Sequence, residues 1–345
     1  MRLGLLCLLI GAAILVCAAA AGADDEAQSA SARSGKTDWF LHARYGVFVH
    51  YLFGLQNGED NPHSLGRHTS WDECVKAFDV QRFAKQMHEA GAGYVIFTMM
   101  QRTRYIIAPN DTFDRITGYA PGEACATRDL VLDLYNALHK YRIPLMLYWT
   151  GDGPLDDPKA GAAMGFRGSG PVSEQFVRNW ASVVSEYGER YGDRVAGYWC
   201  DGCYRSIGYD DRRLAILASG LRAGSERRII ALNVGVEARV HSYSRHEDFT
   251  TGEQNAFKDI PDARFVGGEQ WHLLSFLGDN WAQPGTRLGK RQLVDYVAAC
   301  NAKGGVVSID VMLYRDGAID RSQLEILKAL RPGLERKPAA GKSGG

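Results

Sequence analysis

Three carboxylates could act as acids, bases or nucleophiles because of where they stand in the chain. Asp201 ends the apolar run 195–201, and Glu253 and Glu269 end two shorter runs further along. Runs rich in aromatic and β-branched residues are typical of buried parallel strands, and parallel α/β proteins gather their functional groups where such strands end. We therefore expect these acids to share a site. The alternative for Asp201 is that it only caps the following turn.

Polar and aromatic side chains occupy similar positions near the ends of other apolar runs. His50 ends the first run, Gln101 and Arg102 follow the second, and Trp199 and Trp271 stand beside two of the acids. Carboxylates beside aromatic rings suit glycoside hydrolysis, in which one carboxylate attacks or stabilises the anomeric carbon and another protonates the leaving oxygen. The rings would stack on apolar sugar faces, and the polar groups would bind hydroxyls. The alternative for any one acid is a structural ion pair with an arginine at the rim.

The elements that must position these residues form a repeating pattern of short strands and helices. At this length, the pattern predicts one (β/α)8 TIM-like barrel. No helix is expected between the sixth and seventh strands, so the barrel should be irregular. A doubly wound open sheet is the alternative, although no strand is followed by a glycine-rich phosphate-binding motif. We expect strands at 45–52, 93–98, 144–149, 195–202, 229–234, 248–253, 264–269 and 305–310, and helices at 78–90, 127–138, 173–190, 209–222, 290–300 and 322–330.

The N-terminus has the pattern of an export signal. Arg2 precedes a long apolar run that ends in small residues, which predicts a signal peptide over residues 1–23 and a mature chain from Asp24. A disordered linker over 24–36, the catalytic barrel over 37–335 and a flexible tail over 336–345 would follow. We expect a secreted or periplasmic protein. An uncleaved membrane anchor, or a lipid anchor at Cys17, is the alternative.

Composition narrows the classes of partner and cofactor. Lys and Arg together number 40, as do Asp and Glu, and no basic run is present, so nucleic acid is not an expected partner. Cys200 and Cys203 form a C-x-x-C motif, which could indicate a redox or zinc site. No second C-x-x-C or closely spaced histidine pair completes a zinc site, and Cys200 lies inside a predicted strand. We therefore expect both thiols to pack in the core, with no metal or cofactor.

Six short segments, in order, resemble the catalytic domain of the α-L-fucosidases, glycoside hydrolase family 29. The first is Trp39 to His50, which resembles the family's W-F-x-x-A-[KR]-[FY]-G-[IV]-F-[IV]-H, and the others are 78–94, 199–202 (W-x-D-G), 248–253 (D-[FY]-x-T-x-E), 269–278 and 301–305 (N-x-K-G-G). The resemblance spans about residues 39–330. It implies an O-glycosyl hydrolase with the barrel fold and a carbohydrate partner, a fucosylated or related glycan.

The same resemblance implies roles for individual residues. Asp201 would be the nucleophile and Glu253 the general acid/base of a retaining double displacement. His50 would bind sugar hydroxyls, and Trp199 would lie beside the nucleophile. Glu269 is the alternative acid/base, but the T-x-E context favours Glu253.

Two segments depart from the family pattern. The family's K-H-H-D-G-F, whose histidines grip fucose, is replaced by Met100-Gln-Arg-Thr-Arg-Tyr105, and N-D-R-W by Asn233-Val-Gly-Val236. Gln101 could replace some of the lost hydrogen bonds, while Arg102 adds a positive charge that would favour an acidic or sulfated sugar. Two alternatives therefore stay open: a glycosidase for a different sugar, and a non-catalytic carbohydrate-binding barrel. The β-sandwich that often follows this barrel is not expected here.

Overall fold

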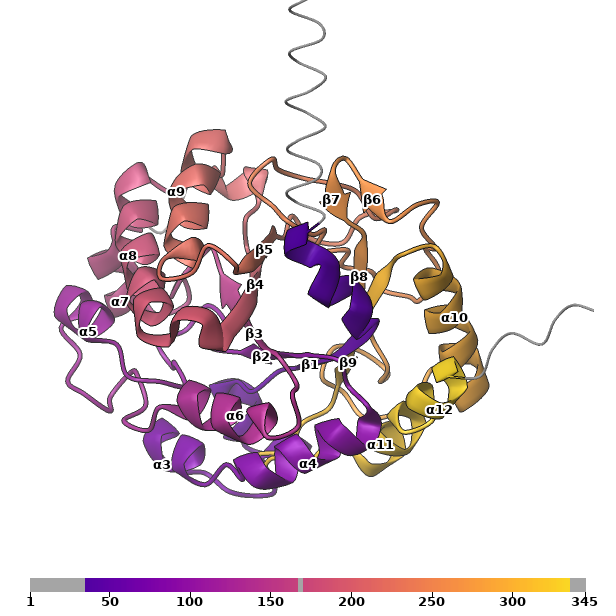
Figure 1. Cartoon of the computed structure of the whole chain (residues 1–345). Coiled ribbons are helices and arrows are strands. Elements are labelled where there is room, and N and C mark those ends of the chain that lie inside the picture. Colours follow the sequence, from indigo (N-terminus) through magenta and orange to yellow (C-terminus); the bar gives the residue numbers. More distant parts are fainter. Residues whose placement is uncertain (1–34, 167–169, 336–345) are drawn as a thin grey trace, which may run out of the picture.

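The core of the fold is a curled sheet of seven parallel strands. The computed structural model describes residues 35–166 and 170–335. The strands follow the order β5-β4-β3-β2-β1-β9-β8, and each neighbouring pair runs parallel (Figure 1). They are β1 (Tyr45–Val49), β2 (Val95–Thr98), β3 (Leu145–Thr150), β4 (Val195–Asp201), β5 (Ile229–Leu232), β8 (His272–Phe276) and β9 (Val306–Val311).

The segment 248–253 fills the space between the edge strands β5 and β8. The backbone amide of Asp248 donates to the carbonyl of Ile230 in β5 at 2.8 Å, and that of Gln254 donates to Leu274 in β8 at 2.9 Å. This segment was predicted to be a strand. It forms only isolated bridges, to Gln270 and Leu274, because its hydrogen bonds alternate between two neighbours. The barrel is therefore (β/α)8-like and irregular, as expected.

The prediction of a barrel strand at 264–269 was wrong. These residues form part of a small antiparallel hairpin, β6 (Phe265–Val266) and β7 (Glu269–Gln270). Gly267 and Gly268 have φ values of 60° and 96°, the left-handed conformation that a tight hairpin turn requires. The strand that pairs with β9 is instead the next apolar run, β8.

Helices cover the outer face of the curled sheet (Figure 1). The long helix α8 begins after Ser173, whose Oγ accepts a hydrogen bond from the amide of Phe176 at 3.0 Å, as predicted. Asp129 caps α6, so this helix begins after the predicted start at residue 127, and the Thr127 hydroxyl donates to Asp72. The helices are α2 (Phe53–Gln56), α3 (Trp71–Lys76), α4 (Val80–Ala90), α5 (Asp111–Thr117), α6 (Leu130–His139), α7 (Pro158–Met164), α8 (Glu174–Tyr191), α9 (Asp211–Arg222), α10 (Lys290–Ala302), α11 (Arg321–Leu327) and α12 (Leu330–Glu335).

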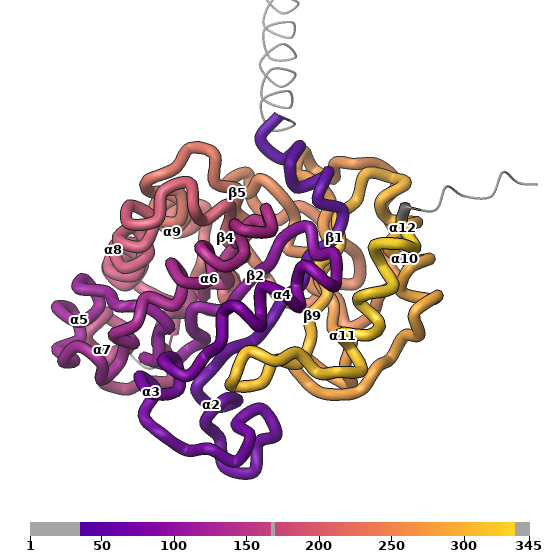
Figure 2. Tube along the Cα trace, turned by 60° about the horizontal axis from the view of Figure 1, so that its bottom comes forward, coloured from indigo at the N-terminus to yellow at the C-terminus, as the bar shows by residue number. Residues whose placement is uncertain are grey.

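A helix over residues 35–43 covers the amino-terminal end of the barrel. The ring of Phe40 lies 4.8 Å from that of Tyr94 and 4.9 Å from that of Phe249, so aromatic packing fills this end. Figure 2 shows α2, which follows β1, at the end away from this helix. The carboxyl ends of the strands are therefore the end at which a site can open.

Several predicted segments lie outside the described residues. These are the signal peptide 1–23, the tail 336–345 and all but the last two residues of the linker 24–36. Within the described ranges, no helix is both long enough and apolar enough to cross a bilayer. The described chain ends with α11 and α12, and no β-sandwich follows the barrel there.

Candidate active site

A pocket of about 270 Å³ opens at the carboxyl ends of the strands. Its volume is slightly below the ~300–1,000 Å³ that is usual for sites of drug-sized ligands, which suits a group as small as one sugar ring. Aromatic and aliphatic side chains form most of the wall, and four polar side chains face the same space. The lining residues are Phe48, His50, Leu52, Leu55, Gln101, Tyr148, Trp199, Asp201, Glu253, Leu274, Trp281 and Ala282.

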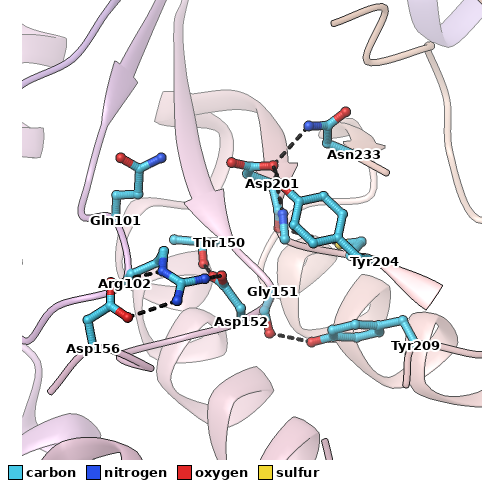
Figure 3. Close-up of polar contacts among 12 residues, drawn as sticks. Gln101, Arg102, Thr150, Gly151, Asp152, Asp156, Asp201, Tyr204, Tyr209 and Asn233 are labelled. Carbon is cyan, nitrogen blue, oxygen red and sulfur yellow. Dashed lines mark hydrogen bonds and ion pairs between the residues drawn. The ribbon is translucent and has the colours of Figure 1, made fainter. Parts of the chain in front are cut away.

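Asp201, the last residue of β4, is held by four hydrogen-bond donors. The hydroxyl of Tyr148 donates to Oδ2 at 2.8 Å. Oδ1 accepts bonds from the amide of Gly202 at 2.7 Å, the hydroxyl of Tyr204 at 2.9 Å and the side-chain amide of Asn233 at 2.8 Å (Figure 3). Donors to both oxygens stabilise the charged carboxylate and fix its orientation, as a nucleophile requires.

Tyr148 connects Asp201 to Gln101. The side-chain amide of Gln101 donates to the Tyr148 hydroxyl at 2.9 Å, which leaves the hydroxyl proton to point at Asp201. Burial and the charge of Asp201 raise the pKa of Tyr148, so the phenol keeps this proton. The Tyr148 ring stacks on Trp199, with centroids 5.6 Å apart, and the indole nitrogen of Trp199 donates to the carbonyl of Thr251 at 3.0 Å. Both rings are therefore fixed in the pocket wall.

Glu253 also lines the pocket, on the segment that closes the barrel. Its Oε2 accepts a hydrogen bond of 2.7 Å from Nδ2 of Asn233. Burial, followed by the negative charge of Asp201, raises the pKa of Glu253 to about 7, while the Asn233 hydrogen bond and His50 oppose this shift. A substantial fraction of Glu253 is therefore protonated near neutral pH, and it shares a hydrogen-bond donor with a second carboxylate.

The shared donor Asn233 limits the distance between the two acids. Its Nδ2 is 2.8 Å from Oδ1 of Asp201 and 2.7 Å from Oε2 of Glu253. The two oxygens cannot lie further apart than the sum of these distances. This upper limit for one pair of oxygens is below the ~6.5–9.5 Å that separates the two carboxyl groups of inverting glycosidases, and it allows the ~5–5.5 Å of retaining ones.

His50 and Trp281 also line the pocket. Nδ1 of His50 lies 2.8 Å from Oδ1 of the buried Asp310, whose Oδ2 accepts a bond from the amide of Ala282 at 2.7 Å. The carboxylate fixes the orientation of the imidazole that lines the pocket. The ring of Trp281 lies 6.3 Å from that of His50. Sequence reasoning missed Trp281 because it stands in a polar loop after β8 and not at the end of a strand.

Arg102 lies at the rim but does not line the pocket. Its guanidinium forms two bonds to Asp156, at 2.9 and 2.8 Å, and one of 2.8 Å to Asp152 (Figure 3). Two carboxylates therefore compensate the charge of Arg102. Its role is a structural ion pair at the rim and not contact with the pocket.

Glu269 and Trp271 also lie away from the pocket lining. Glu269 is 1% exposed and belongs to the hairpin strand β7, and Trp271 is 3% exposed in the core. Trp271 packs so closely on Gly305 that a Cβ there would come within 2.7 Å of its ring. The structure therefore brings together His50, Gln101, Trp199, Asp201 and Glu253, and leaves Arg102, Glu269 and Trp271 outside.

The C-x-x-C motif supports the site through its backbone. Sγ of Cys203 lies 3.8 Å from Sγ of Cys200, and both thiols are buried. The backbone amide of Cys203 donates to the carbonyl oxygen of Asn233 at 3.0 Å. The backbone amide of Asn233 donates to the carbonyl oxygen of Cys200 at 2.6 Å. In the described parts of the chain, no group of three or more His, Cys, Asp or Glu side chains is arranged to hold a metal ion.

Comparison with known proteins agrees with this geometry. A family model described as alpha-L-fucosidase matches residues 68–335. No curated protein matches the sequence.

Solved structures share the fold at low sequence identity. α-L-Fucosidase isoenzyme 1 from Paenibacillus thiaminolyticus has a TM-score of 0.62 and 17% identity over 87% of this chain and 75% of its own. A family 29 α-L-fucosidase from Bacteroides thetaiotaomicron has a TM-score of 0.61 and 16% identity over 86% of this chain and 72% of its own. An endo-fucoidan hydrolase from glycoside hydrolase family 107 has a TM-score of 0.67 and 13% identity over 86% and 53%. These similarities confirm the predicted barrel fold.

Proposed function

Because the chain belongs to the α-L-fucosidase family, we propose that it is a retaining glycosidase that removes a terminal α-linked L-fucose or a closely related sugar. Its class, a glycosidase, follows from the family, while the sugar, the mechanism and the catalytic residues are our proposal. The observation that carries it is the single amide of Asn233 that binds both Asp201 and Glu253 inside one pocket.

The proposed reaction is a double displacement. Asp201, charged and oriented by four donors, attacks the anomeric carbon, while Glu253 gives its proton to the glycosidic oxygen. A glycosyl ester on Asp201 and the free alcohol of the leaving group result. Glu253, now ionised, then removes a proton from water, which attacks the anomeric carbon and releases Asp201. The pKa of Glu253, about 7, suits both steps, because a group that gives and takes a proton works best near the ambient pH.

The pocket wall supports a deoxy sugar as the substrate. Phe48, Trp199 and Trp281 offer apolar faces, and His50 and Gln101 offer hydrogen bonds in the same lining. A 6-deoxy sugar combines a methyl group with a ring of hydroxyls, which matches this mixture. The solved relatives named above act on fucose-containing compounds according to their descriptions.

A non-catalytic carbohydrate-binding barrel is the second candidate. The residues that replace the family's paired histidines favour it, since Arg102 is engaged by two aspartates and only Gln101 reaches the pocket. This candidate predicts saturable binding of a sugar without its hydrolysis.

Hydrolysis of a panel of aryl glycosides, with an aryl α-L-fucoside among them, separates the two. We expect turnover of one panel member, a product that keeps its anomeric configuration by NMR, and a loss of at least ~10³-fold in kcat for Asp201→Ala. Asp262→Ala, a substitution at an exposed carboxylate, is the matched control and should retain full activity. Binding without turnover would establish the second candidate, and equal turnover by Asp201→Ala would exclude the proposed nucleophile.

We also propose that the protein is exported with cleavage before Asp24. Arg2, the apolar run and the small residues at 21–23 support this. Expression in a Gram-negative host should deliver the protein to the periplasm, and N-terminal sequencing should begin at Asp24. A chain that keeps residue 1 and sediments with membranes would instead indicate an uncleaved anchor.

A further inference from the structure

A second hollow lies next to the sugar pocket, between the loops that follow β4 and β5. Its volume is about 530 Å³, roughly twice that of the pocket. The first loop contributes the short 3-10 helix η3 (Arg205–Ile207), and the second runs from Val234 to Tyr243. The side chains that matter for its chemistry are Tyr204, Arg205, Val234, Glu237, His241 and Tyr243.

The hollow lies beside both proposed catalytic acids, although neither acid lines it. The hydroxyl of Tyr204, which lines the hollow, donates to Asp201 at 2.9 Å. A very small cleft of about 10 Å³, lined by Glu237, Tyr243 and Glu253, lies between the hollow and Glu253. In the proposed reaction the glycosidic oxygen must lie at Glu253, while the sugar pocket has room for little more than one ring. The leaving group therefore has space in this hollow.

The wall of the hollow combines aromatic rings with a cation that no protein carboxylate neutralises. The guanidinium of Arg205 lies over the ring of Tyr243, 5.4 Å from its centroid, and the Tyr243 hydroxyl donates to the carbonyl of Cys203 at 3.0 Å. Arg205 is exposed and makes no ion pair with any residue in the described ranges. Arg239, on the other loop, is paired with Asp259 at 3.3 Å.

We propose that this hollow binds the leaving-group sugar and that Arg205 selects leaving groups that carry an anion, either a carboxylate or a sulfate ester. This inference rests on the proposed function. A guanidinium binds such groups with two parallel hydrogen bonds, and stacking on Tyr243 holds its plane in place. Tyr204 and Val234 supply an apolar face for the sugar ring. Glu237, the lining carboxylate on the opposite loop, accepts hydrogen bonds from hydroxyls.

Hydrolysis of matched disaccharides tests the selectivity. The probes carry the accepted sugar on galactose, on galacturonate and on galactose 6-sulfate, and an aryl glycoside of the same sugar serves as the neutral reference. We expect kcat/KM to be about tenfold higher, or more, for at least one anionic probe than for the galactose probe. This preference should shrink as salt increases. In Arg205→Gln it should vanish, while hydrolysis of the aryl glycoside stays unchanged. Arg227→Gln, at an exposed arginine that does not line the hollow, is the matched control and should keep the preference.

The outcomes separate this inference from the proposed function. Equal kcat/KM for all three disaccharides, or a preference that survives in Arg205→Gln, overturns the role of Arg205 while hydrolysis itself still stands. If no glycoside is hydrolysed, the proposed function fails. Calorimetric titration with free galacturonate and galactose 6-sulfate then decides whether the hollow binds anionic sugars through Arg205. Salt-dependent binding that Arg205→Gln abolishes supports an anion site in the hollow, and its absence excludes one. Comparison of the two probes tells carboxylate from sulfate.

Discussion

Nδ2 of Asn233 lies 2.7 Å from Oε2 of Glu253. The same nitrogen donates to Asp201, so one neutral amide stands between two acids that would otherwise repel each other. The backbone of Asn233 is in turn held by the backbones of Cys200 and Cys203. This residue, which follows β5, therefore links the two acids and lowers the pKa of Glu253, which burial and the charge of Asp201 raise.

Replacement of Asn233 by alanine should shift the pH dependence of hydrolysis. The Asn233 hydrogen bond lowers the pKa of Glu253, so its removal should raise that pKa further. The limb of kcat/KM that falls at high pH should move to higher pH, and kcat should decrease because Asp201 loses a donor. Asn255→Ala, at an exposed asparagine of the following loop, is the matched control. An unchanged pH profile in Asn233→Ala would show that the amide does not set the pKa.

The proton on Glu253 gives a pH dependence with a defined sign. The acid must be protonated for the first step, so kcat/KM should be highest below pH 7 and fall about tenfold per pH unit above the pKa of about 7. Glu253→Gln should remove this limb. With a good leaving group the glycosyl ester should still form, but its hydrolysis should be slow because the general base for the second step is missing.

Azide offers a direct comparison of Glu253 with Glu269. Azide needs no general base, so it should restore turnover of an activated aryl glycoside in a Glu253→Ala variant and yield a glycosyl azide. Glu269→Gln, at a buried carboxylate outside the pocket, is the control and should keep the high-pH limb. Azide rescue in a Glu269 variant alone would assign the acid/base to Glu269 instead.

Tyr148→Phe tests how much the hydrogen bond from the Tyr148 hydroxyl to Asp201 contributes to catalysis. The variant keeps the ring that stacks on Trp199 and removes the hydrogen bond to Asp201. A hydrogen bond to a charged group contributes about 1.5–3 kcal/mol, so kcat should fall ~10–100-fold with little change in melting temperature. Steady-state kinetics and circular dichroism measure the two effects. Wild-type kcat in this variant would mean that the remaining donors suffice.

The thiols of Cys200 and Cys203 should be dispensable for catalysis. The double variant Cys200→Ala/Cys203→Ala removes two buried sulfur atoms but keeps the backbone bonds to Asn233. We expect wild-type kcat/KM and a melting temperature a few degrees lower, because small cavities form in the core. Reductant should not alter wild-type activity. A loss of activity in a well-folded double variant, or activation by reductant, would support the redox alternative.

Local sequence determined much of the barrel and the two proposed catalytic acids. The strands β1 to β5 and β9 could be recognised in the sequence as short apolar runs. A parallel strand that is buried on both faces requires such a run. Ser173 and Gly91 mark helix ends through hydrogen bonds and backbone angles that involve only near neighbours. Asp201 and Glu253 were found because their short motifs keep the family's order.

Contacts between distant segments decided the rest. The run at 264–269 contains Phe265 and Val266, but it forms a hairpin, and the pairing partner of β9 is β8. Glu269 and Trp271 therefore lie outside the pocket. Arg102 follows β2 as a sugar-binding residue would, yet two aspartates from the loop after β3 take its charge. Sequence spacing fixes which residues share a strand. Which side chains meet, and how close two carboxylates come, depends on long-range hydrogen bonds that form only when the barrel closes.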